Sequence, residues 1–498
     1  MSISVGIAAE PKRDWRIFST PNFELLTDGG DREAKAVLTR LERYRAAILE
    51  VQSGRLISSL PTRVYLILAE DEWSRLRKLS ASNPSIAGIY RATPWQNLLA
   101  ISSADDKRTE GRVTLHEYTH LLLRHRQQDW PLWMREGLAE LLGTVDLNGE
   151  RAVFGEPNRL AVLYLRRRGL MPMETLFSLE QTTNTIRDTE LMTRLYAQSW
   201  AVAHYLKFAL PPETAPQFEQ FRTAIAQGVP TTEALKKQLN LTSEQLKKAI
   251  SSHINSGNYR TQRVALPPSV RNMSPPRERP VAPGEAEAWL GDWALESEEL
   301  EAATRRYEAS LREAPDNFFG LLGEGRVLTA QKQYAAALVR LRQAAQQNPQ
   351  SGWAQLFLGS CLLDATASEP RSVSENVMRL DEAIQTLKRA TELMPEYPPA
   401  YVQLARAYGA TRSRLREAIE AVTKARDLEP AALNTYLMSA AILAENGQAQ
   451  RALETLDTLA RTVPSQSAVK AARALAEVIR SRGSPKLLDA LYNLQPKL

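Results

Sequence analysis

Cysteine is almost absent from the chain, and its scarcity limits the chemistry that the protein can carry out. A single cysteine, Cys361, occurs among 498 residues. An intrachain disulfide is therefore impossible, and so is a metal site built from several thiolates of this chain. Because cysteine-poor proteins occur in both reducing and oxidising compartments, the scarcity leaves the cellular compartment open.

Long apolar runs are also missing. No stretch approaches the roughly 20 residues that a membrane-spanning helix needs. The clearest apolar run, residues 64–69, has the length and β-branching of a strand. Residues 2–9 are weakly apolar but have neither a basic start nor a long hydrophobic centre, so they do not make a convincing signal peptide. We therefore expect no transmembrane segment.

The chain has no strong excess of charge of either sign. Its 63 basic and 57 acidic residues are spread along the whole length and leave a formal net charge of +6. Such a distribution gives little support to nucleic-acid binding, and the cluster Arg166 to Arg168 fits a solvated helix face. The hydrophobic share of 43% is that of a globular protein, and the length predicts two or three domains.

The first half of the sequence predicts strands followed by helices. The strand segments are 15–27, 63–69 and 86–102, and the early helices are 31–51 and 71–79. From about residue 106 to about residue 254, amphipathic helices follow one another. We therefore expect an α+β domain over residues 12–256.

A proline-rich segment follows this domain. Six prolines lie amid Arg, Ser and Asn between residues 257 and 284, a composition that resists both helix and sheet. The segment predicts a linker. Prolines do not forbid ordered contact, so an extended strap packed along one domain stays open as an alternative.

The remaining residues repeat with a period near 34. Five helix-ending prolines are spaced by 34, 46, 35 and 34, namely Pro315, Pro349, Pro395, Pro430 and Pro464. Twelve residues before each proline lies an alanine, the set being Ala303, Ala337, Ala383, Ala418 and Ala452. Five residues before each proline the side chain is also mostly small, at Ser310, Ala344, Ala390, Ala425 and Leu459. Two antiparallel helices need small side chains where they approach closely, so the pattern predicts repeated helix pairs.

This pattern resembles tetratricopeptide repeats over about residues 285–466. The resemblance implies an all-α solenoid over residues 285–498, with about five repeats and a final helix, 467–482, that caps the stack. The long spacing of 46, in the third repeat, contains residues 365–377, rich in Ser, Glu and Pro, which predict an inserted loop. A protein partner is expected on the concave face of the array.

The residues that point to chemistry are 116–120, which read H-E-Y-T-H inside a predicted helix over 108–125. Because four residues make about one helical turn, His116 and His120 project from the same face and can bind one cation. Glu117, one position on, can reach a water beside that cation. Neutral imidazoles favour Zn2+, which in catalytic sites takes three protein ligands and keeps one position open.

A third ligand is expected on a second helix. Residues 133–140 read W-M-R-E-G-L-A-E, and fifteen residues intervene between His120 and Glu136. Glu136 is therefore the candidate third zinc ligand. Glu140, four residues later on the same face, could accept a hydrogen bond from a ligand histidine, although solvent exposure is an equal alternative.

Together these motifs resemble the gluzincin peptidases, the relatives of thermolysin and aminopeptidase N. The form W-x-x-E-G-x-A is close to aminopeptidase N, and the chain is still more similar to the bacterial peptidase-MA-like group, over roughly residues 12–254. The resemblance implies a thermolysin-like core with zinc on His116, His120 and Glu136. Zinc lowers the pKa of a bound water toward about 7, and Glu117 would accept the proton.

The resemblance also implies a donor for the oxyanion of the reaction. Gluzincins supply a tyrosine or a histidine from a later helix. Tyr196 lies at about the expected distance after the glutamate ligand, and His204 is the second choice. Residues 86–102 would correspond to the edge strand on which an extended substrate aligns. The G-x-M-E-N element of aminopeptidase N is absent there, so its exopeptidase specificity is not expected.

We therefore expect a zinc metallopeptidase, an endopeptidase rather than an exopeptidase, that hydrolyses peptides or unfolded proteins while its repeats recruit a substrate or partner. The alternative is a non-catalytic repeat scaffold with a structural or vestigial zinc site. No nucleic acid partner is expected. The family resemblance suggests a soluble protein of the bacterial periplasm, or one secreted with its signal trimmed, with the cytoplasm as the other possibility.

Overall fold

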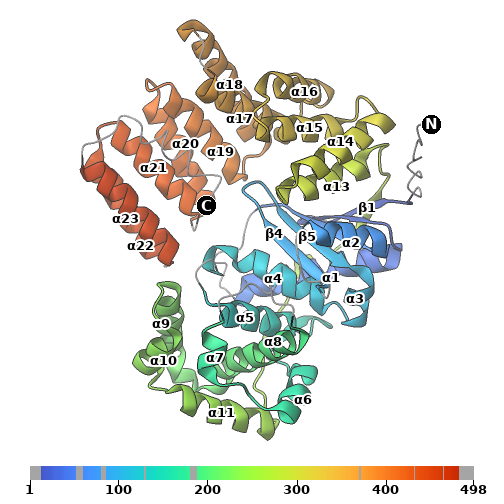
Figure 1. Ribbon diagram of the computed structural model, residues 1–498, viewed down its shortest axis with the longest axis vertical. Coiled ribbons are helices and arrows are strands. Elements are labelled where there is room, and N and C mark those ends of the chain that lie inside the picture. Colours follow the sequence, from blue (N-terminus) through green and yellow to red (C-terminus); the bar gives the residue numbers. More distant parts are fainter. Residues whose placement is uncertain are drawn as a thin grey trace, which may run out of the picture.

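An α+β region is followed by an array of helices that arches beside it (Figure 1). The computed structural model describes residues 13–51, 60–79, 86–127, 130–179, 188–369, 372–430, 432–463 and 465–481, without the side chains of 124–127. No helix in this described part combines the length and the apolar character that a membrane crossing needs.

The α+β region is built around a six-stranded sheet with the order β4-β5-β3-β2-β1-β8. The strands are β1 Arg16–Ser19, β2 Phe23–Thr27, β3 Thr62–Ile67, β4 Gly88–Ala92, β5 Asn97–Ser102 and β8 Arg277–Arg279. The pairs β2–β3 and β3–β5 are parallel, whereas β4 runs antiparallel to β5 at one edge of the sheet. The strands predicted in 15–27, 63–69 and 86–102 are thus confirmed, with 15–27 and 86–102 each divided into two by a turn.

Alternation along these strands creates two cores, because successive side chains point to opposite faces of a sheet. Phe18, Leu25 and Val64 face the larger core, which α1 (Asp31–Val51) and α4 (Arg112–Gln127) cover. Their neighbours Ile17, Leu26 and Tyr65 face a second core, covered by α2 (Glu70–Lys78) and α13 (Glu285–Glu296).

Below the sheet in Figure 1 lies a group of helices that completes the larger core. The remaining elements before the array are α3 Ser103–Arg108, α5 Leu132–Gly143, β6 Arg151–Phe154, α6 Arg159–Arg168, α7 Met173–Phe177, α8 Thr189–His204, a π-helical turn Tyr205–Ala209, a short 3-10 helix Pro212–Thr214, α9 Ala215–Ala226, α10 Thr231–Leu239, α11 Ser243–Ser256, β7 Gln262–Ala265 and α12 Pro268–Arg271.

The proline-rich segment 257–284 is not a free linker, and here the first prediction was wrong. Its strand β7 pairs with β6, and β8 pairs with β1 as the far edge of the main sheet. The strap alternative is the one that the structure bears out. The prolines fit because they fall where no ladder N–H is needed: Pro267 and Pro268 start α12, and Pro280 follows β8 directly.

Five antiparallel helix pairs and one further helix make up the described part of the array. Their bounds are α13 Glu285–Glu296, α14 Leu300–Glu313, α15 Phe318–Ala330, α16 Tyr334–Gln347, α17 Gly352–Ser368, α18 Val373–Leu393, α19 Pro398–Ala410, α20 Leu415–Leu428, α21 Leu433–Glu445, α22 Ala449–Thr462 and α23 Gln466–Arg480. The second helix of each pair ends two residues before one of the periodic prolines. All ten side chains singled out twelve and five residues before those prolines are fully buried, as close helix packing requires.

The extra residues of the third repeat do not form the predicted loop over 365–377. They lengthen α17, which continues to Ser368, and α18, which begins at Val373, while 370 and 371 lie outside the described residues. Ser372 opens α18 with a reciprocal capping box to Glu375, which satisfies the first free backbone N–H groups of the helix. The local Ser and Glu content thus marked a helix start instead of a loop.

The array packs directly on the sheet through α13. Trp289 and Trp293 are fully buried, and the hydroxyl of Tyr65 donates a hydrogen bond of 2.7 Å to the Trp289 carbonyl. Arg63 of β3 stacks 3.9 Å over the Trp289 ring and forms an ion pair with Asp292. The first helix of the repeats is therefore also a covering layer of the α+β region.

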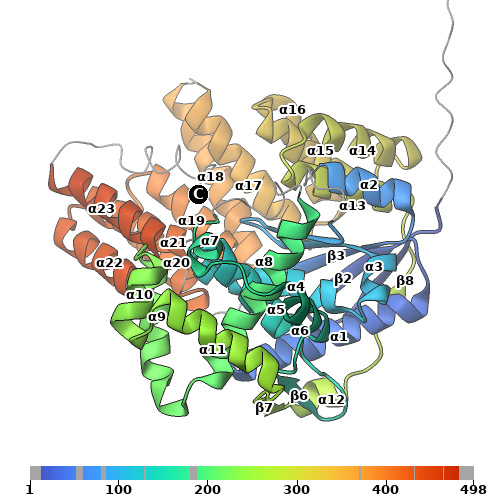
Figure 2. The same cartoon turned by 60° about the horizontal axis from the view of Figure 1, so that its bottom comes forward.

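The far end of the array returns to the α+β region. Both views place α22 and α23 beside α9 and α10 (Figures 1 and 2). In the turn between α9 and α10, a Cβ built on Gly228 would lie 2.9 Å from Cδ of Gln466, the first residue of α23. The array thus contacts the first domain at both of its ends.

Candidate metal centre

Three potential metal ligands from two neighbouring helices converge on one point. His116 and His120 lie on α4, and Glu136 lies on α5. The Nε2 atoms of the two histidines are 3.3 Å apart, and Oε2 of Glu136 lies 3.3 Å from His116 Nε2 and 3.5 Å from His120 Nε2. The structure therefore brings together the three residues predicted as zinc ligands, and all three are buried or nearly so.

The spacing of these three atoms fits one small divalent cation. Zinc binds imidazole nitrogen and carboxylate oxygen at about 2.0–2.1 Å, and a tetrahedron of that radius has edges of about 3.3–3.4 Å. The three measured separations, 3.3, 3.3 and 3.5 Å, match such edges. Two neutral imidazoles and one carboxylate are also a donor set that zinc accepts.

Two glycines of α5 allow the close approach of the helices that carry the site. A Cβ on Gly143 would lie 3.2 Å from the backbone nitrogen of His116, so α5 lies directly against α4 there. A Cβ on Gly137 would lie 2.4 Å from the carbonyl oxygen of Ser199, so a side chain cannot be placed between α5 and α8. The glycine of W-x-x-E-G-x-A thus sets the distance between the helix that bears Glu136 and α8.

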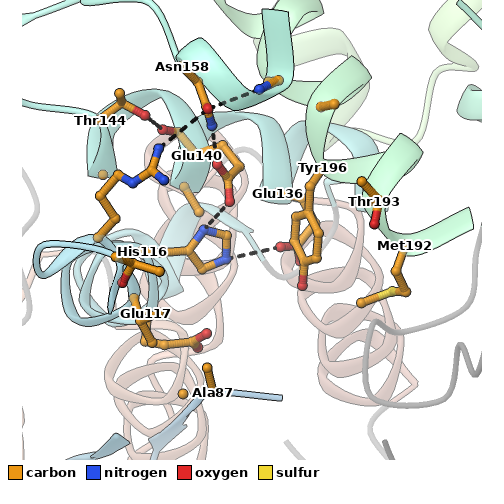
Figure 3. A pocket seen from close by; sticks show the side chains of 18 of the residues that line it. Ala87, His116, Glu117, Glu136, Glu140, Thr144, Asn158, Met192, Thr193 and Tyr196 are labelled. Carbon is orange, nitrogen blue, oxygen red and sulfur yellow. Dashed lines mark hydrogen bonds and ion pairs between the residues drawn. The ribbon is translucent and has the colours of Figure 1, made fainter. Parts of the chain in front are cut away.

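Glu140 orients one of the ligand histidines. Its Oε1 lies 3.1 Å from Nδ1 of His116, the nitrogen that faces away from the cluster. Its Oε2 accepts a 3.0 Å hydrogen bond from the amide of Asn158, whose own oxygen accepts a 3.4 Å bond from Arg112 (Figure 3). Of the two alternatives for Glu140, the structure supports the orienting one, because such a contact fixes the imidazole tautomer.

Electrostatics of the cluster follow from these contacts. Burial opposes the protonation of His116, but the hydrogen bonds to Glu136 and Glu140 outweigh it and raise the pKa of the imidazole. Burial would raise the pKa of Glu136, yet the attraction of His120 and the hydrogen bonds to both histidines lower it instead. The carboxylate of Glu136 is therefore held in its charged form, the form that binds a cation.

Glu117 lies beside the cluster without joining it. Burial raises the pKa of its carboxyl, against the lowering effect of the two histidines. Its side chain rests on β4 at Gly88, where a Cβ would lie only 2.6 Å from Glu117 Cγ. A carboxyl with a raised pKa is a stronger proton acceptor than an ordinary one, which is the property required of a general base.

The site opens into a cavity of about 640 Å³. Strand β4 forms one wall of it, and residues of α6 and α8 form the opposite wall. Tyr196 enters the cavity from α8 beside His116, with the two rings edge to face at 5.6 Å (Figure 3). Tyr90 of β4 stacks on His120 with ring centres 4.8 Å apart, and burial raises its pKa to about 12, helped by Glu136 and Glu117.

His204, the second choice for an oxyanion donor, is not in this cavity. Its side chain is fully buried, and Nε2 lies 2.9 Å from the Gly155 carbonyl. Because a carbonyl can only accept, Nε2 carries the proton, and Nδ1 accepts a 3.1 Å bond from His253. His204, at the end of α8, therefore forms a separate pair with His253 of α11, and of the two candidates only Tyr196 lines the cavity.

We expect His204 to make the stability of the protein dependent on pH. Burial, with a smaller effect of His253, lowers the pKa of His204 to about 4, against the hydrogen bond to Gly155. An unfolded histidine has a pKa near 6.5, so the unfolded chain takes up a proton first as the pH falls. We expect His204 to cost about 3 kcal/mol of stability between pH 6.5 and 4. Urea unfolding of the wild type and of His204→Gln at both pH values measures this difference, and identical pH dependence would refute it.

Several residues of the site are not apparent from sequence patterns. Tyr90 and Gly88 belong to β4, and Asn158 and Arg112 complete the contacts around Glu140. Asn158 carries one local signal, because it opens α6 as an N-cap whose side chain accepts from Ala161. The others become functional candidates only through the pairing of β4 with β5 and the packing of that hairpin on α4.

Comparisons with known proteins cover the two halves separately. Residues 114–221, which contain the whole metal cluster and Tyr196, match a family described as "Protein of unknown function (DUF1570)". Residues 328–367 match the tetratricopeptide repeat family, which confirms the prediction of such repeats in the C-terminal part. Repeats of this kind indicate a scaffold for protein interaction. Neither family description names a peptidase, so the resemblance to gluzincins stays a prediction. No curated protein matches the chain.

Solved structures are similar to parts of this chain. One is TTC0263, a thermophilic TPR protein of Thermus thermophilus, with 18% identity and a TM-score of 0.35 over 39% of this chain and 99% of that one. Another is MamA of Desulfovibrio magneticus RS-1, with 19% identity and a TM-score of 0.30 over 36% of this chain and 93% of that one.

Proposed function

We propose that the chain is a zinc-dependent peptidase that cleaves peptides or unfolded protein segments. The observation that carries this proposal is the convergence of His116, His120 and Glu136 in the wall of an open cavity, with the half-buried carboxyl of Glu117 beside them. Structural zinc sites are closed by four protein ligands, whereas catalytic sites have three and face open space. Among the described residues, the cluster offers three.

Each residue has a role in such a reaction. A zinc ion on the three ligands would activate a water and polarise a peptide carbonyl. Glu117 removes the proton from the attacking water and later returns it to the leaving amine. Tyr196, whose ring enters the cavity beside His116, is the proposed donor to the oxygen on which negative charge develops. Glu140 holds His116 in its orientation.

The position of β4 in the cavity wall favours a polypeptide as the substrate. Among the described strands, β4 is the outermost of the sheet and pairs on one side only, with β5. An extended peptide can add to such an edge by backbone hydrogen bonds that do not depend on its sequence. This placement also supports the thermolysin-like assignment of the core, in which the strand before the metal helix aligns the substrate.

The alternative is a repeat scaffold whose metal cluster is structural or vestigial. The comparisons favour it, because the tetratricopeptide match concerns protein interaction and neither family description names hydrolysis. Glu117 argues for catalysis, since a structural site has no use for a further carboxyl that lines the cavity and does not join the cluster.

Zinc content provides the first test. We expect purified protein to carry about one zinc per chain and to lose it when His116 or Glu136 is replaced by glutamine, because two remaining ligands do not hold the ion. Elemental analysis after dialysis against a weak chelator measures the ratio. Glu174→Gln, which neutralises an exposed carboxylate of α7, is the matched control and should keep the zinc.

Two results would count against the proposal. A natively folded wild type that takes up no zinc would remove the metal from the site. Zinc retained at wild-type affinity in both His116→Gln and Glu136→Gln would show that the ion binds elsewhere.

A further inference from the structure

The tip of the β4–β5 hairpin docks on the repeat array. The turn between the strands, residues 93–96, is closed by Thr93, whose hydroxyl donates to the Gln96 carbonyl at 2.8 Å and accepts from the Gln96 N–H at 3.0 Å. This closed turn holds Trp95 at the point of the hairpin farthest from the sheet. Figure 1 shows the hairpin reaching from the sheet toward the arch of the array.

An aromatic seat on the array receives Trp95. Its ring meets Phe357 of α17 edge to face at 5.3 Å, and its carbonyl accepts a hydrogen bond from the hydroxyl of Tyr397, at the start of α19. Trp353 completes the seat, stacked on Phe357 at 5.8 Å and 5.1 Å from Tyr397. We call Trp353, Phe357 and Tyr397 the aromatic seat.

The aromatic seat includes residues of two helix pairs. Arg326 connects it to α13, the helix that attaches the array to the sheet. Phe357 belongs to the third helix pair and Tyr397 to the fourth, while Arg326 of the second pair lies 4.4 Å over the Phe357 ring. Arg326 also pairs with Asp292 of α13 at 2.8 Å. Small rotations between successive repeats set the curvature of a solenoid, so a change in curvature would shift the seat.

The other end of the hairpin touches the metal centre. Gly88 and Tyr90 of β4 lie seven and five residues before Trp95, about 15–25 Å along an extended strand. Gly88 supports the side chain of Glu117, and Tyr90 stacks on His120. The strand that contacts the proposed base and a proposed ligand is thus held at its free end by the array.

The geometry points to a role for the array inside its own chain: through Trp95 and the aromatic seat, the repeats position β4 against the metal centre. Trp95 is then a positioning residue for the site. This inference deepens the proposed function, because it names how the repeats act on the proposed active site. The array then has a role within its own chain, in addition to any binding of a protein partner.

Hydrogen exchange of the β4 amides tests the inference without metal or substrate. We expect Trp95→Ala to speed the exchange of the amides that bond β4 to β5 by about tenfold, since it removes the aromatic contacts that hold the tip. Phe357→Ala should produce the same local change from the other side of the contact. Trp95→Phe, which keeps an aromatic ring, should restore most of the protection.

Controls separate positioning from general loosening. Phe319→Ala removes a phenylalanine of α15 that contacts Phe318, and it should leave β4 unchanged. The amides of β3, read in the same experiment, should keep wild-type protection in every variant. Exchange of β4 within twofold of wild type in Trp95→Ala, or β3 loosened as much as β4, would overturn the inference.

Activity gives a second readout that depends on the proposed function. If the wild type hydrolyses unfolded protein, Trp95→Ala should lower kcat by about tenfold with zinc still bound, because Glu117 loses its support at Gly88. If Trp95→Ala speeds amide exchange in β4 but leaves kcat unchanged, the position of β4 does not affect catalysis. A wild type without activity would refute the proposed function alone, and the exchange data would still decide whether the array holds β4.

Discussion

Replacing Glu117 by glutamine is expected to abolish the hydrolysis of a denatured protein such as casein while the zinc stays bound. Glutamine has the same shape, so its side chain can keep the contact with Gly88, but it cannot take a proton from water. Removal of a general base typically costs 10²–10⁴-fold in rate, so activity should fall by about this factor. The measurement is kcat on unfolded substrate together with zinc content.

The control for this variant is Glu140→Gln, in the same cavity but acting through His116. Loss of an orienting carboxylate should weaken zinc binding about 10–100-fold and leave turnover largely intact once zinc is in excess. Glu117→Gln should show the opposite pattern, with normal zinc affinity and no turnover. Equal activity of wild type and Glu117→Gln would exclude Glu117 as the base, and the scaffold alternative would then be favoured.

A chain that ends at residue 284 is not expected to fold, although that residue is the end of the predicted linker. The truncation removes α13 and with it Trp289 and Trp293, both fully buried against the sheet. Each tryptophan buries roughly 150–250 Å², worth about 4–6 kcal/mol at 25 cal/mol per Å² as an upper estimate. The two together equal a large part of the 5–15 kcal/mol by which a domain is typically stable.

Electrostatics add to this expected loss. Arg63 of β3 is largely buried and loses its partner Asp292 in the truncated chain. Circular dichroism and size-exclusion chromatography would show an aggregated or unfolded product. A chain that ends at residue 347 keeps α13 to α16, including the Asp292 to Arg326 ion pair, and should fold. A monomeric, cooperatively folded 1–284 fragment would show that the sheet does not need the array.

The metal centre was largely predictable because its information is local in the sequence. His116 and His120 are one helical turn apart, so any helix over these residues places them on one face. Glu136 needed a second helix, and the short W-M-R-E-G-L-A-E segment supplied both the carboxylate and the glycine that brings α8 close. Tyr196 and His204, eight residues apart on α8, were ranked only by their distance from Glu136 along the sequence. That the cavity reaches only the first half of α8 became clear from the structure.

Predictions failed where the outcome depended on a distant partner. The prolines of 257–284 correctly exclude a long helix, but nothing local shows that β8 completes the sheet next to β1. In the same way, the domain boundary predicted near residue 285 lies where the repeats start. The core that contains Trp289 and Tyr65 includes residues from both sides of this boundary. Trp95 lies in a short polar turn and carried no signal of its contact with α17.

By itself, the sequence determined the local elements of this protein: the strands of the α+β region, the helix that pairs two histidines around Glu117, and a helical repeat marked by prolines and small residues at a fixed period. These follow from interactions within a few residues or one turn. Only the tertiary structure decided that Glu136 meets both histidines, that β4 lies beside them, and that the first repeat covers the sheet. Such contacts join residues up to about three hundred positions apart, as Trp95 and Tyr397 do, and they depend on how whole faces pack.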